Sequence, residues 1–169
     1  MKLSATELMK KLKYIEEEIN DIHHDDETKS YVPAENCREE GAAKYCPIFE
    51  SGYDFEGNRG RIKELHEEEI KIRRVLNEFN QKTIVEGYNF NINEGLIRLA
   101  QLKGEVKILT NMTKRGQYMR EGYSRETISM AVYKLDQAKC ALKEAQRNLS
   151  ALQVAIDKTN LNSSIEYQD

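Results

Sequence analysis

The sequence predicts a mainly α-helical protein, an antiparallel bundle of about four long helices with a small β element. Apolar residues recur at alternating steps of three and four, which is the heptad pattern of packed helices. Charged residues make up 33% of the chain and the net charge is −3. Many, nearly balanced charges are typical of solvent-exposed helix faces that carry both signs. The chain has no Trp and only two Pro, which is compatible with long helices.

The first predicted helix begins at Ser4 and extends to His24. Ser4 and Glu7 have the spacing of a capping box, in which each side chain bonds the backbone of the other residue. The apolar seam of this helix consists of Leu8, Leu12, Ile15, Ile19 and Ile22. Such a seam needs another helix as its partner.

Residues 25–52 show no sustained periodicity and contain Pro33, Gly41, Pro47 and Gly52. We expect an irregular loop or lid here, inside a single domain that spans residues 1–169. Loops of this length within compact domains are uncommon and are often functional.

Two further helices are predicted at residues 55–80 and 91–112. In the first of these, Glu69 stands where the seam calls for an apolar residue, and we interpret it as a structural polar residue. In the second, Asn91 and Glu94 repeat the capping pattern. Gly95 and Gly104 lie inside that helix, where we expect them to permit close packing.

The fourth predicted helix has the most regular pattern. Its apolar residues, at steps of three and four, are Leu135, Ala138, Leu142, Ala145, Leu149, Leu152 and Ile156. Small residues at two of these positions let a neighbouring helix approach closely. Short β-prone segments near residues 83–90, 127–133 and 161–167 are expected to form a small sheet at one end of the bundle.

Several motifs, in this order, resemble one protein family. They are Tyr53-Asp54-Phe55, Asn77-Glu78-Phe79-Asn80 with Thr83, Ile92-Asn93-Glu94, Gln101-Leu102, and Leu152-Gln153 with Asp157 and Asn160. The set resembles small, uncharacterised helical proteins of Gram-positive bacteria, related to a group sometimes labelled septicolysin-like. The resemblance covers residues 1–24 and 53–169.

This resemblance implies an oligomeric helical fold and an intracellular location, but it supplies no reaction and no catalytic residue. The chain departs from the family at two places, Gln81-Lys82-Thr83 and Val132-Tyr133-Lys134. If those polar positions form a family site, the site is altered here. The label septicolysin is the name of a toxin, and nothing in the sequence supports a toxin activity.

The sequence also indicates the cellular compartment in which we expect the protein. No apolar run approaches the ~18 residues of a membrane span, and the N-terminus lacks the apolar stretch of a signal peptide. We therefore expect a cytoplasmic protein with no membrane partner. Cys37, Cys46 and Cys140 form no CxxC motif, and inert free thiols are the preferred interpretation. A redox pair or half of a zinc site at Cys37 and Cys46 is the alternative.

The densest group of metal-ligand residue types is His23-His24-Asp25-Asp26, to which His66, with Glu69 one turn further on, could add ligands from the second helix. The alternative is a polar helix end, because histidine is favourable beside the negative end of a helix dipole. A di-iron bundle is excluded because no Glu-x-x-His motif is present. We predict no cofactor.

A second candidate site is basic. Lys114, Arg115, Arg120 and Arg125 alternate with two tyrosines, a combination that can contact phosphates and stack on bases. Glu121 and Glu126 dilute the positive charge, and the chain as a whole is acidic. A solvated connection between elements is the preferred interpretation, and nucleic acid is a disfavoured partner.

These observations favour a non-enzymatic, self-associating structural or interaction protein. The seam residues expected to carry a homo-oligomer contact are Leu135, Leu142, Leu149, Leu152 and Ile156. One alternative is an enzyme that depends on a metal or binds a phosphate ligand, with its site near residues 23–26. A second alternative is a nucleic-acid-binding module that uses the loop at residues 114–125.

Overall fold

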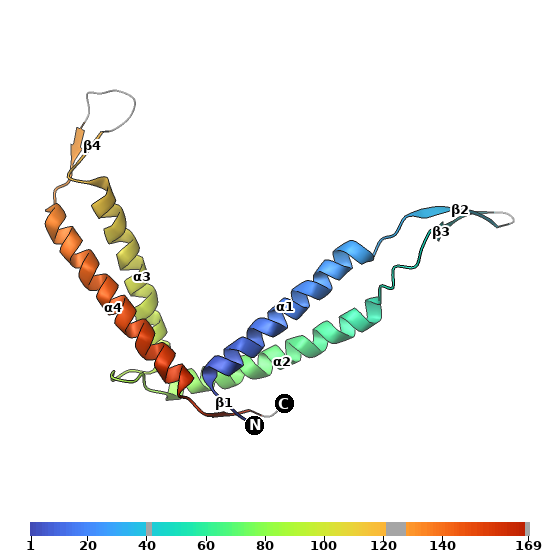
Figure 1. Cartoon of the computed structure of the whole chain (residues 1–169), viewed down its shortest axis with the longest axis horizontal. Helices are drawn as coiled ribbons and strands as arrows, with labels where there is room; N and C mark the ends of the chain where they lie inside the picture. Colours follow the sequence, from blue (N-terminus) through green and yellow to red (C-terminus); the bar gives the residue numbers. More distant parts are fainter. Residues whose placement is uncertain (40–41, 121–127, 168–169) are drawn as a thin grey trace. The chain divides into compact units, whose positions relative to one another are not determined.

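The computed structural model describes residues 1–39, 42–120 and 128–167 and confirms a mainly helical fold. Four helices dominate it (Figure 1). They are α1 (Ala5–Lys29), α2 (Phe55–Lys82), α3 (Ile92–Arg115) and α4 (Leu135–Leu161). The contacts within the chain divide it into two compact units, which are described in turn.

The short strands pair in three separate antiparallel sheets of two strands each within the described residues. These pairs are β1 (Lys2–Leu3) with β6 (Ile165–Glu166), β2 (Ala34–Glu39) with β3 (Ala42–Pro47), and β4 (Tyr118–Arg120) with β5 (Ile128–Met130). The expectation of one small sheet was therefore wrong. Residues 83–90 contribute only an isolated bridge between Ile84 and Asn91, because those residues are taken up by a tight helix connection.

The first unit, Met1–Asn77 with Ser164–Asp169, is built on α1 and α2, which run antiparallel side by side (Figure 1). The predicted capping box begins α1: the Glu7 amide donates to Ser4 Oγ at 3.2 Å, and the Ser4 amide donates to Glu7 Oε2 at 2.7 Å. The helix continues past the predicted end at His24 to Lys29. The buried aliphatic residues of the two helices are Leu8, Leu12, Ile15, Ile62, Leu65, Ile72 and Leu76.

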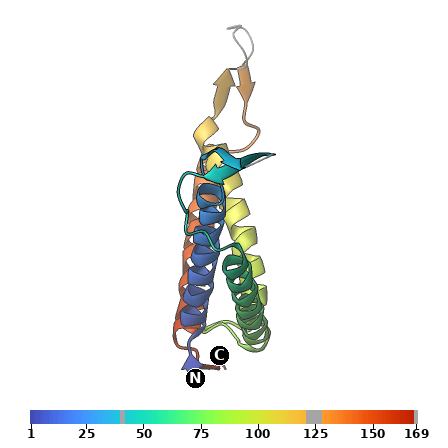
Figure 2. The same cartoon turned by 90° about the vertical axis from the view of Figure 1, so that its right-hand side faces the viewer.

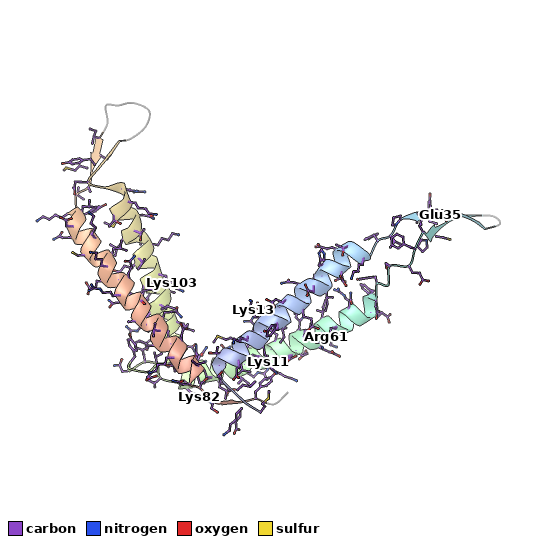
Figure 3. All side chains as sticks on the ribbon, in the orientation of Figure 1. Lys11, Lys13, Glu35, Arg61, Lys82 and Lys103 are labelled. Atoms are coloured by element: carbon purple, nitrogen blue, oxygen red, sulfur yellow. The ribbon has the colours of Figure 1, made fainter. Side chains whose placement is uncertain are left out.

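Charged side chains connect α1 and α2 along the rim of this apolar seam. Arg61 Nε donates to Glu18 Oε1 at 2.7 Å, and Arg73 Nη2 donates to Glu16 Oε1 at 3.2 Å. Arg61 is among the side chains marked on the helix pair in Figure 3. Arg73 Nε also donates to Glu69 Oε1 at 2.6 Å. Glu69 is thus a structural ion-pair residue, as the sequence predicted.

A β-hairpin replaces most of the predicted irregular loop at residues 25–52, which is a correction to the sequence analysis. Residues 25–29 complete α1, and β2 and β3 pair in register from Ala34 with Pro47 to Glu39 with Ala42. The hairpin extends beyond the ends of α1 and α2 (Figure 1). The sequence analysis missed these strands because the segment has few of the β-branched residues that are typical of strands.

The two ends of the described chain meet in the first unit. The Met1 ammonium donates to the Tyr167 carbonyl at 2.7 Å, and the Tyr167 amide donates to the Met1 carbonyl at 2.9 Å. Together with the β1–β6 pairing, these bonds fix both ends beside the start of α1. Tyr167 is almost fully buried.

The second unit, Glu78–Ser163, is built on α3 and α4. Its core consists of Val85, Ile92, Leu99, Leu152 and Ile156. The predicted cap at Asn91 is present, with the Glu94 amide donating to Asn91 Oδ1 at 2.9 Å. A tight connection precedes it, in which the Val85 amide donates to the Phe90 carbonyl at 3.0 Å.

Small residues bring α3 and α4 close together. Ala138 and Ala145 of α4 are buried, and a Cβ atom added at Gly95 of α3 would lie 3.2 Å from Ile156 Cδ1 and 3.3 Å from Val85 Cγ2. The close packing predicted for Gly95 is therefore confirmed. Beyond the paired helices, the β4–β5 hairpin continues from the end of α3 (Figure 2).

Candidate functional site

The densest polar contact in the first unit joins the end of α1 to the start of α2 through Asp26. Tyr53 Oη donates to Asp26 Oδ1 at 2.6 Å, and the Arg59 guanidinium pairs with Asp26 Oδ2. Asn58 Nδ2 lies 3.5 Å from Asp26 Oδ1. His23 Nδ1 lies 3.5 Å from Asp26 Oδ2. We refer to Asp26, Tyr53, Asn58 and Arg59 as the Asp26 cluster.

The electrostatics of the Asp26 cluster favour the ionised carboxylate. The hydrogen bond from Tyr53 is the main cause that lowers the pKa of Asp26 to about 2, and Arg59 and Asn58 add to it against the cost of burial. The same bond raises the pKa of the Tyr53 phenol. A carboxylate held in this state by several donors is a poor general base, because its lone pairs are already occupied. The geometry is that of a structural contact that connects the end of α1 to the start of α2.

The predicted metal ligands are not brought together. His23 faces Asp26, while Asp25 Oδ2 accepts an ion pair from Lys29 Nζ at 2.8 Å. His24 is exposed. His66 lies seven residues beyond Arg59 on α2, about two helical turns away. Among the residues that the structure describes, no group of three or more His, Cys, Asp or Glu could hold a metal ion.

The basic candidate site is described only in part. Lys114 and Arg115 are exposed in the last turn of α3. The side chain of Arg120 and the whole of Arg125 lie outside the described residues. Whether the four residues come together is therefore not tested by the described residues, and a phosphate or nucleic-acid site in this loop stays a prediction.

The predicted oligomer seam on α4 divides into two groups. Leu152 and Ile156 are buried in the core of their own unit, against Leu99 and Ile92 of α3. This placement takes both side chains away from any surface that a second copy could contact. Leu135, Leu142 and Leu149 are half-buried. Their part in an interface stays a prediction.

The cysteines differ from the expectation of three free thiols. Cys140 is a free, exposed thiol on α4, as predicted. Cys46 on β3 is disulfide-bonded, so the prediction was wrong for this residue. The side chain of Cys37 lies outside those that the structure describes. A disulfide in the hairpin is a covalent constraint on a segment that a two-stranded ladder alone stabilises weakly.

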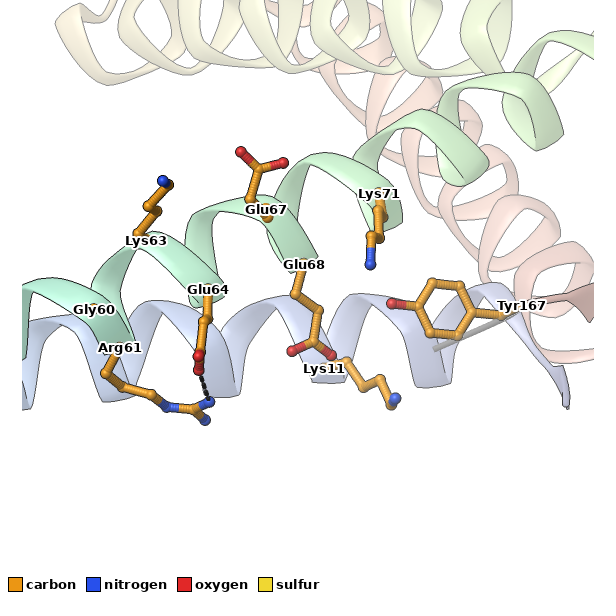
Figure 4. Close-up of a pocket in the computed structure, with 9 residues that line it drawn as sticks. All are labelled: Lys11, Gly60, Arg61, Lys63, Glu64, Glu67, Glu68, Lys71 and Tyr167. Atoms are coloured by element: carbon orange, nitrogen blue, oxygen red, sulfur yellow. Dashed lines mark hydrogen bonds and ion pairs between the residues drawn. The ribbon is translucent and has the colours of Figure 1, made fainter. Parts of the chain in front are cut away.

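An open groove of about 860 Å³ lies in the first unit between α2 and the start of α1 (Figure 4). Its lining mixes both charges: Lys11, Arg61, Lys63, Glu64, Glu67, Glu68 and Lys71, with Gly60 and Tyr167. Lys11 Nζ lies 5.0 Å from the centre of the Tyr167 ring, and Arg61 Nη1 donates to Glu64 Oε2 at 3.3 Å. The lining offers no nucleophile paired with a base, and its four basic and three acidic side chains nearly balance.

A smaller hollow of about 340 Å³ lies in the second unit beside Phe90. The Arg98 guanidinium stands 4.7 Å from the centre of the Phe90 ring and donates to Glu94 Oε1 at 2.6 Å. Gln101 and Asn148 are among the residues that line it. The arrangement could hold a small polar molecule, but Arg98 already has two partners and no catalytic group faces it.

No described helix is long and apolar enough to cross a membrane. Comparison with family models gave no match, and no curated protein matches the sequence. One solved structure has a similar fold: a functionally unknown conserved protein from Corynebacterium diphtheriae, with a TM-score of 0.75 and 14% sequence identity. The alignment covers 98% of this chain and all of that one. At this identity the likeness shows the fold alone.

Sequence reasoning missed the Asp26 cluster. Tyr53 and Arg59 are 27 and 33 residues from Asp26, and the hairpin between them was interpreted as a loop. Periodicity reports which face of a helix is apolar and says nothing of which polar residues meet at a helix end. The available signal was the clustering of Tyr53, Asn58 and Arg59 around the start of the second helix.

Proposed function

We propose that this protein is a self-associating structural or interaction protein that carries out no chemical reaction. The observation that carries this proposal is the thinness of both units. Each unit is built on one pair of helices, so within its own unit a helix packs against one other helix and leaves its opposite face without a helical partner among the described residues. Large apolar side chains remain exposed in both units, among them Tyr31, Phe49 and Phe55 in the first and Ile97 and Ile108 in the second.

Exposed apolar area of this kind commonly marks a protein–protein contact. The separate two-stranded sheets add to the argument. A strand in such a sheet has a partner on one edge only, and an isolated hairpin is marginally stable in water. A second copy is the partner that is always present at matching concentration, and closed homo-oligomers are the commonest assemblies.

The geometry of the polar clusters supports a role without catalysis. The Asp26 cluster occupies its carboxylate with structural donors. The groove between α1 and α2 is lined by charges of both signs.

A cytoplasmic location remains part of the proposal, and the disulfide at Cys46 is the feature that argues against it, because such bonds are typical of oxidising compartments.

Sedimentation equilibrium across a wide range of protein concentration tests the proposal. We expect a mass that is a multiple of the 19.6 kDa chain at the higher concentrations. The fitted mass should fall toward one chain on dilution if the contact is weak. A single-chain mass at every concentration would exclude self-association, and turnover of a substrate by the pure protein would exclude the non-enzymatic role.

A further inference from the structure

The feature that stands out among the helices is an uncharged face on α3. Its residues, at steps of 4, 3, 4, 4 and 3, are Asn93, Ile97, Ala100, Gly104, Ile108 and Asn111. The average step matches the 3.6 residues of a helical turn, so they form one straight stripe. We call the part made by Ile97, Ala100, Gly104 and Ile108 the α3 outer face.

The α3 outer face points away from α4. Gly95, which packs against Ile156 of α4, is nine residues from Gly104, and nine residues are two and a half turns, or about 180° around the helix. Ile97 and Ile108 are 60% and 62% exposed. A helix of a globular unit normally places polar residues on this side, so α3 is apolar on two opposite faces.

The two glycines of α3 differ in their surroundings. A Cβ atom at Gly95 would meet three neighbouring side chains, whereas no described atom lies within 4 Å of a Cβ at Gly104. Glycine in a helix interior is about 1 kcal/mol less favourable than alanine. The packing within the chain explains Gly95 and leaves Gly104 unexplained. A small residue beside Ala100 lets the backbone of a second helix approach closely.

A row of two lysines and a row of one glutamine and one glutamate flank the α3 outer face on opposite sides. Lys103 and Lys107 lie on one side, and Gln101 and Glu105 on the other. Figure 3 marks Lys103 in the first row. No ion pair is recorded for Lys103, Lys107 or Glu105 within the described part of the chain, whereas Arg61, Arg73 and Arg98 all have carboxylate partners. The rows thus lack partners inside their own unit.

The charge pattern selects an orientation for the partner. When two identical helices pair in parallel about a two-fold axis along their length, the left flank of one faces the right flank of the other. Lys103 and Lys107 then face Glu105 and Gln101 of the second copy. In an antiparallel pair, like flanks would meet and the lysine rows would repel each other.

We infer that the α3 outer face is the self-association surface, covered by the same face of a second copy in parallel orientation; this inference rests on the proposed function. The parallel pair also places the C-terminal ends of both α3 helices together. Each of these ends leads into a β4–β5 hairpin whose Tyr118, Ile128 and Met130 are exposed. The hairpins would extend the apolar contact beyond the helices.

The first test replaces Gly104 with glutamate. The site is open, so Gly104→Glu fits the single chain, and helix content should not fall. In the complex, the carboxylate would be buried without a partner, and the dimer dissociation constant should rise about tenfold or more in sedimentation velocity. Gly60→Glu is the matched control, because Gly60 also lies in a helix with no described atom within 4 Å. It should leave the association unchanged.

The second test determines orientation with single cysteines, in a Cys140→Ser background that removes the exposed free thiol. In a parallel pair in register, Ile97→Cys alone and Ile108→Cys alone should each form disulfide-linked dimers under mild oxidation. In an antiparallel pair, only a mixture of the two variants would cross-link efficiently, and that result would overturn the inference.

The outcomes separate this inference from the proposed function. An oligomer that persists unchanged in Gly104→Glu and forms no cross-link at either position overturns the α3 surface while self-association stands. A wild-type protein that is monomeric at all concentrations overturns both. Loss of association in Gly104→Glu, together with cross-links from the single variants, supports the α3 surface.

Discussion

The two helical units reach stability by different kinds of packing. In the first, large aliphatic side chains fill the space between α1 and α2, and arginine–glutamate pairs connect the helices along the rim. In the second, Gly95, Ala138 and Ala145 let α3 and α4 approach closely. The backbones of α3 and α4 therefore lie closer together than those of α1 and α2. The packing of α1 against α2 therefore depends on large side chains, whereas the packing of α3 against α4 depends on small residues.

The largest effect is expected from removing volume in the first unit. Leu65→Ala empties a position that is 1% exposed. The lost transfer free energy and the remaining cavity should lower the free energy of unfolding by about 3 kcal/mol. Urea unfolding followed by circular dichroism measures it. A loss below about 1 kcal/mol would show that α2 collapses onto α1 and that the seam is loosely packed.

Adding volume should be the damaging change in the second unit. Gly95→Leu drives a side chain into Ile156, Val85 and Phe90 and should cost about 2 kcal/mol. Gly104→Ala is the matched change on the open face of the same helix, and its higher helix propensity should add up to about 1 kcal/mol. Both values come from urea unfolding at a protein concentration low enough for the wild type to be monomeric, so that only the packing within the chain is measured. Equal effects at the two glycines would contradict the packing described for α3.

The sequence predicted the starts and the buried positions of the helices, but not which helices pack together. The helix starts at Ser4 and Asn91 are set by local hydrogen bonds, and both were predicted. The buried positions of Leu152 and Ile156 follow from a regular period. That these two residues face α3 of their own chain could not be known, because a heptad seam specifies a helical partner but not which helix.

The hairpin and the Asp26 cluster lay beyond sequence reasoning for a different reason. The strands from Ala34 to Pro47 pair residues up to 13 positions apart, and their polar composition has no strand period. Asp26 sits in a histidine-rich stretch that suggested a metal, yet the structure satisfies its charge with Tyr53 and Arg59.

Acid should weaken the Asp26 cluster. The pKa of Asp26 is about 2 in the folded protein, below its usual 3.8, so its contribution is complete above pH 3.8 and is lost as the pH falls toward 2. Tyr53→Phe removes the main cause and should raise the pKa of Asp26 toward its usual value. A carboxyl NMR titration of both proteins checks this. An unchanged midpoint in Tyr53→Phe would contradict the assigned hydrogen bond.

The smallest effect is expected at the rim of the first unit. Arg73 bonds Glu69 and Glu16 but is half exposed, so solvent screens both pairs. Arg73→Gln should lower the free energy of unfolding by only about 0.5 kcal/mol, and less at high salt. Unfolding at low and high ionic strength measures this difference. A salt-independent loss of several kcal/mol would mean that the rim pairs, and not the aliphatic seam, hold α1 to α2.

A subunit-mixing experiment shows whether the protein self-associates. Isotopically labelled and unlabelled proteins are mixed, and their native mass spectrum is recorded under non-reducing conditions. We expect species that contain both kinds of chain, with masses between those of the fully unlabelled oligomer, a multiple of 19.6 kDa, and the fully labelled one, and free of added ligand mass. A spectrum of single chains only, or of chains that each carry a bound metal or small molecule, would contradict the account.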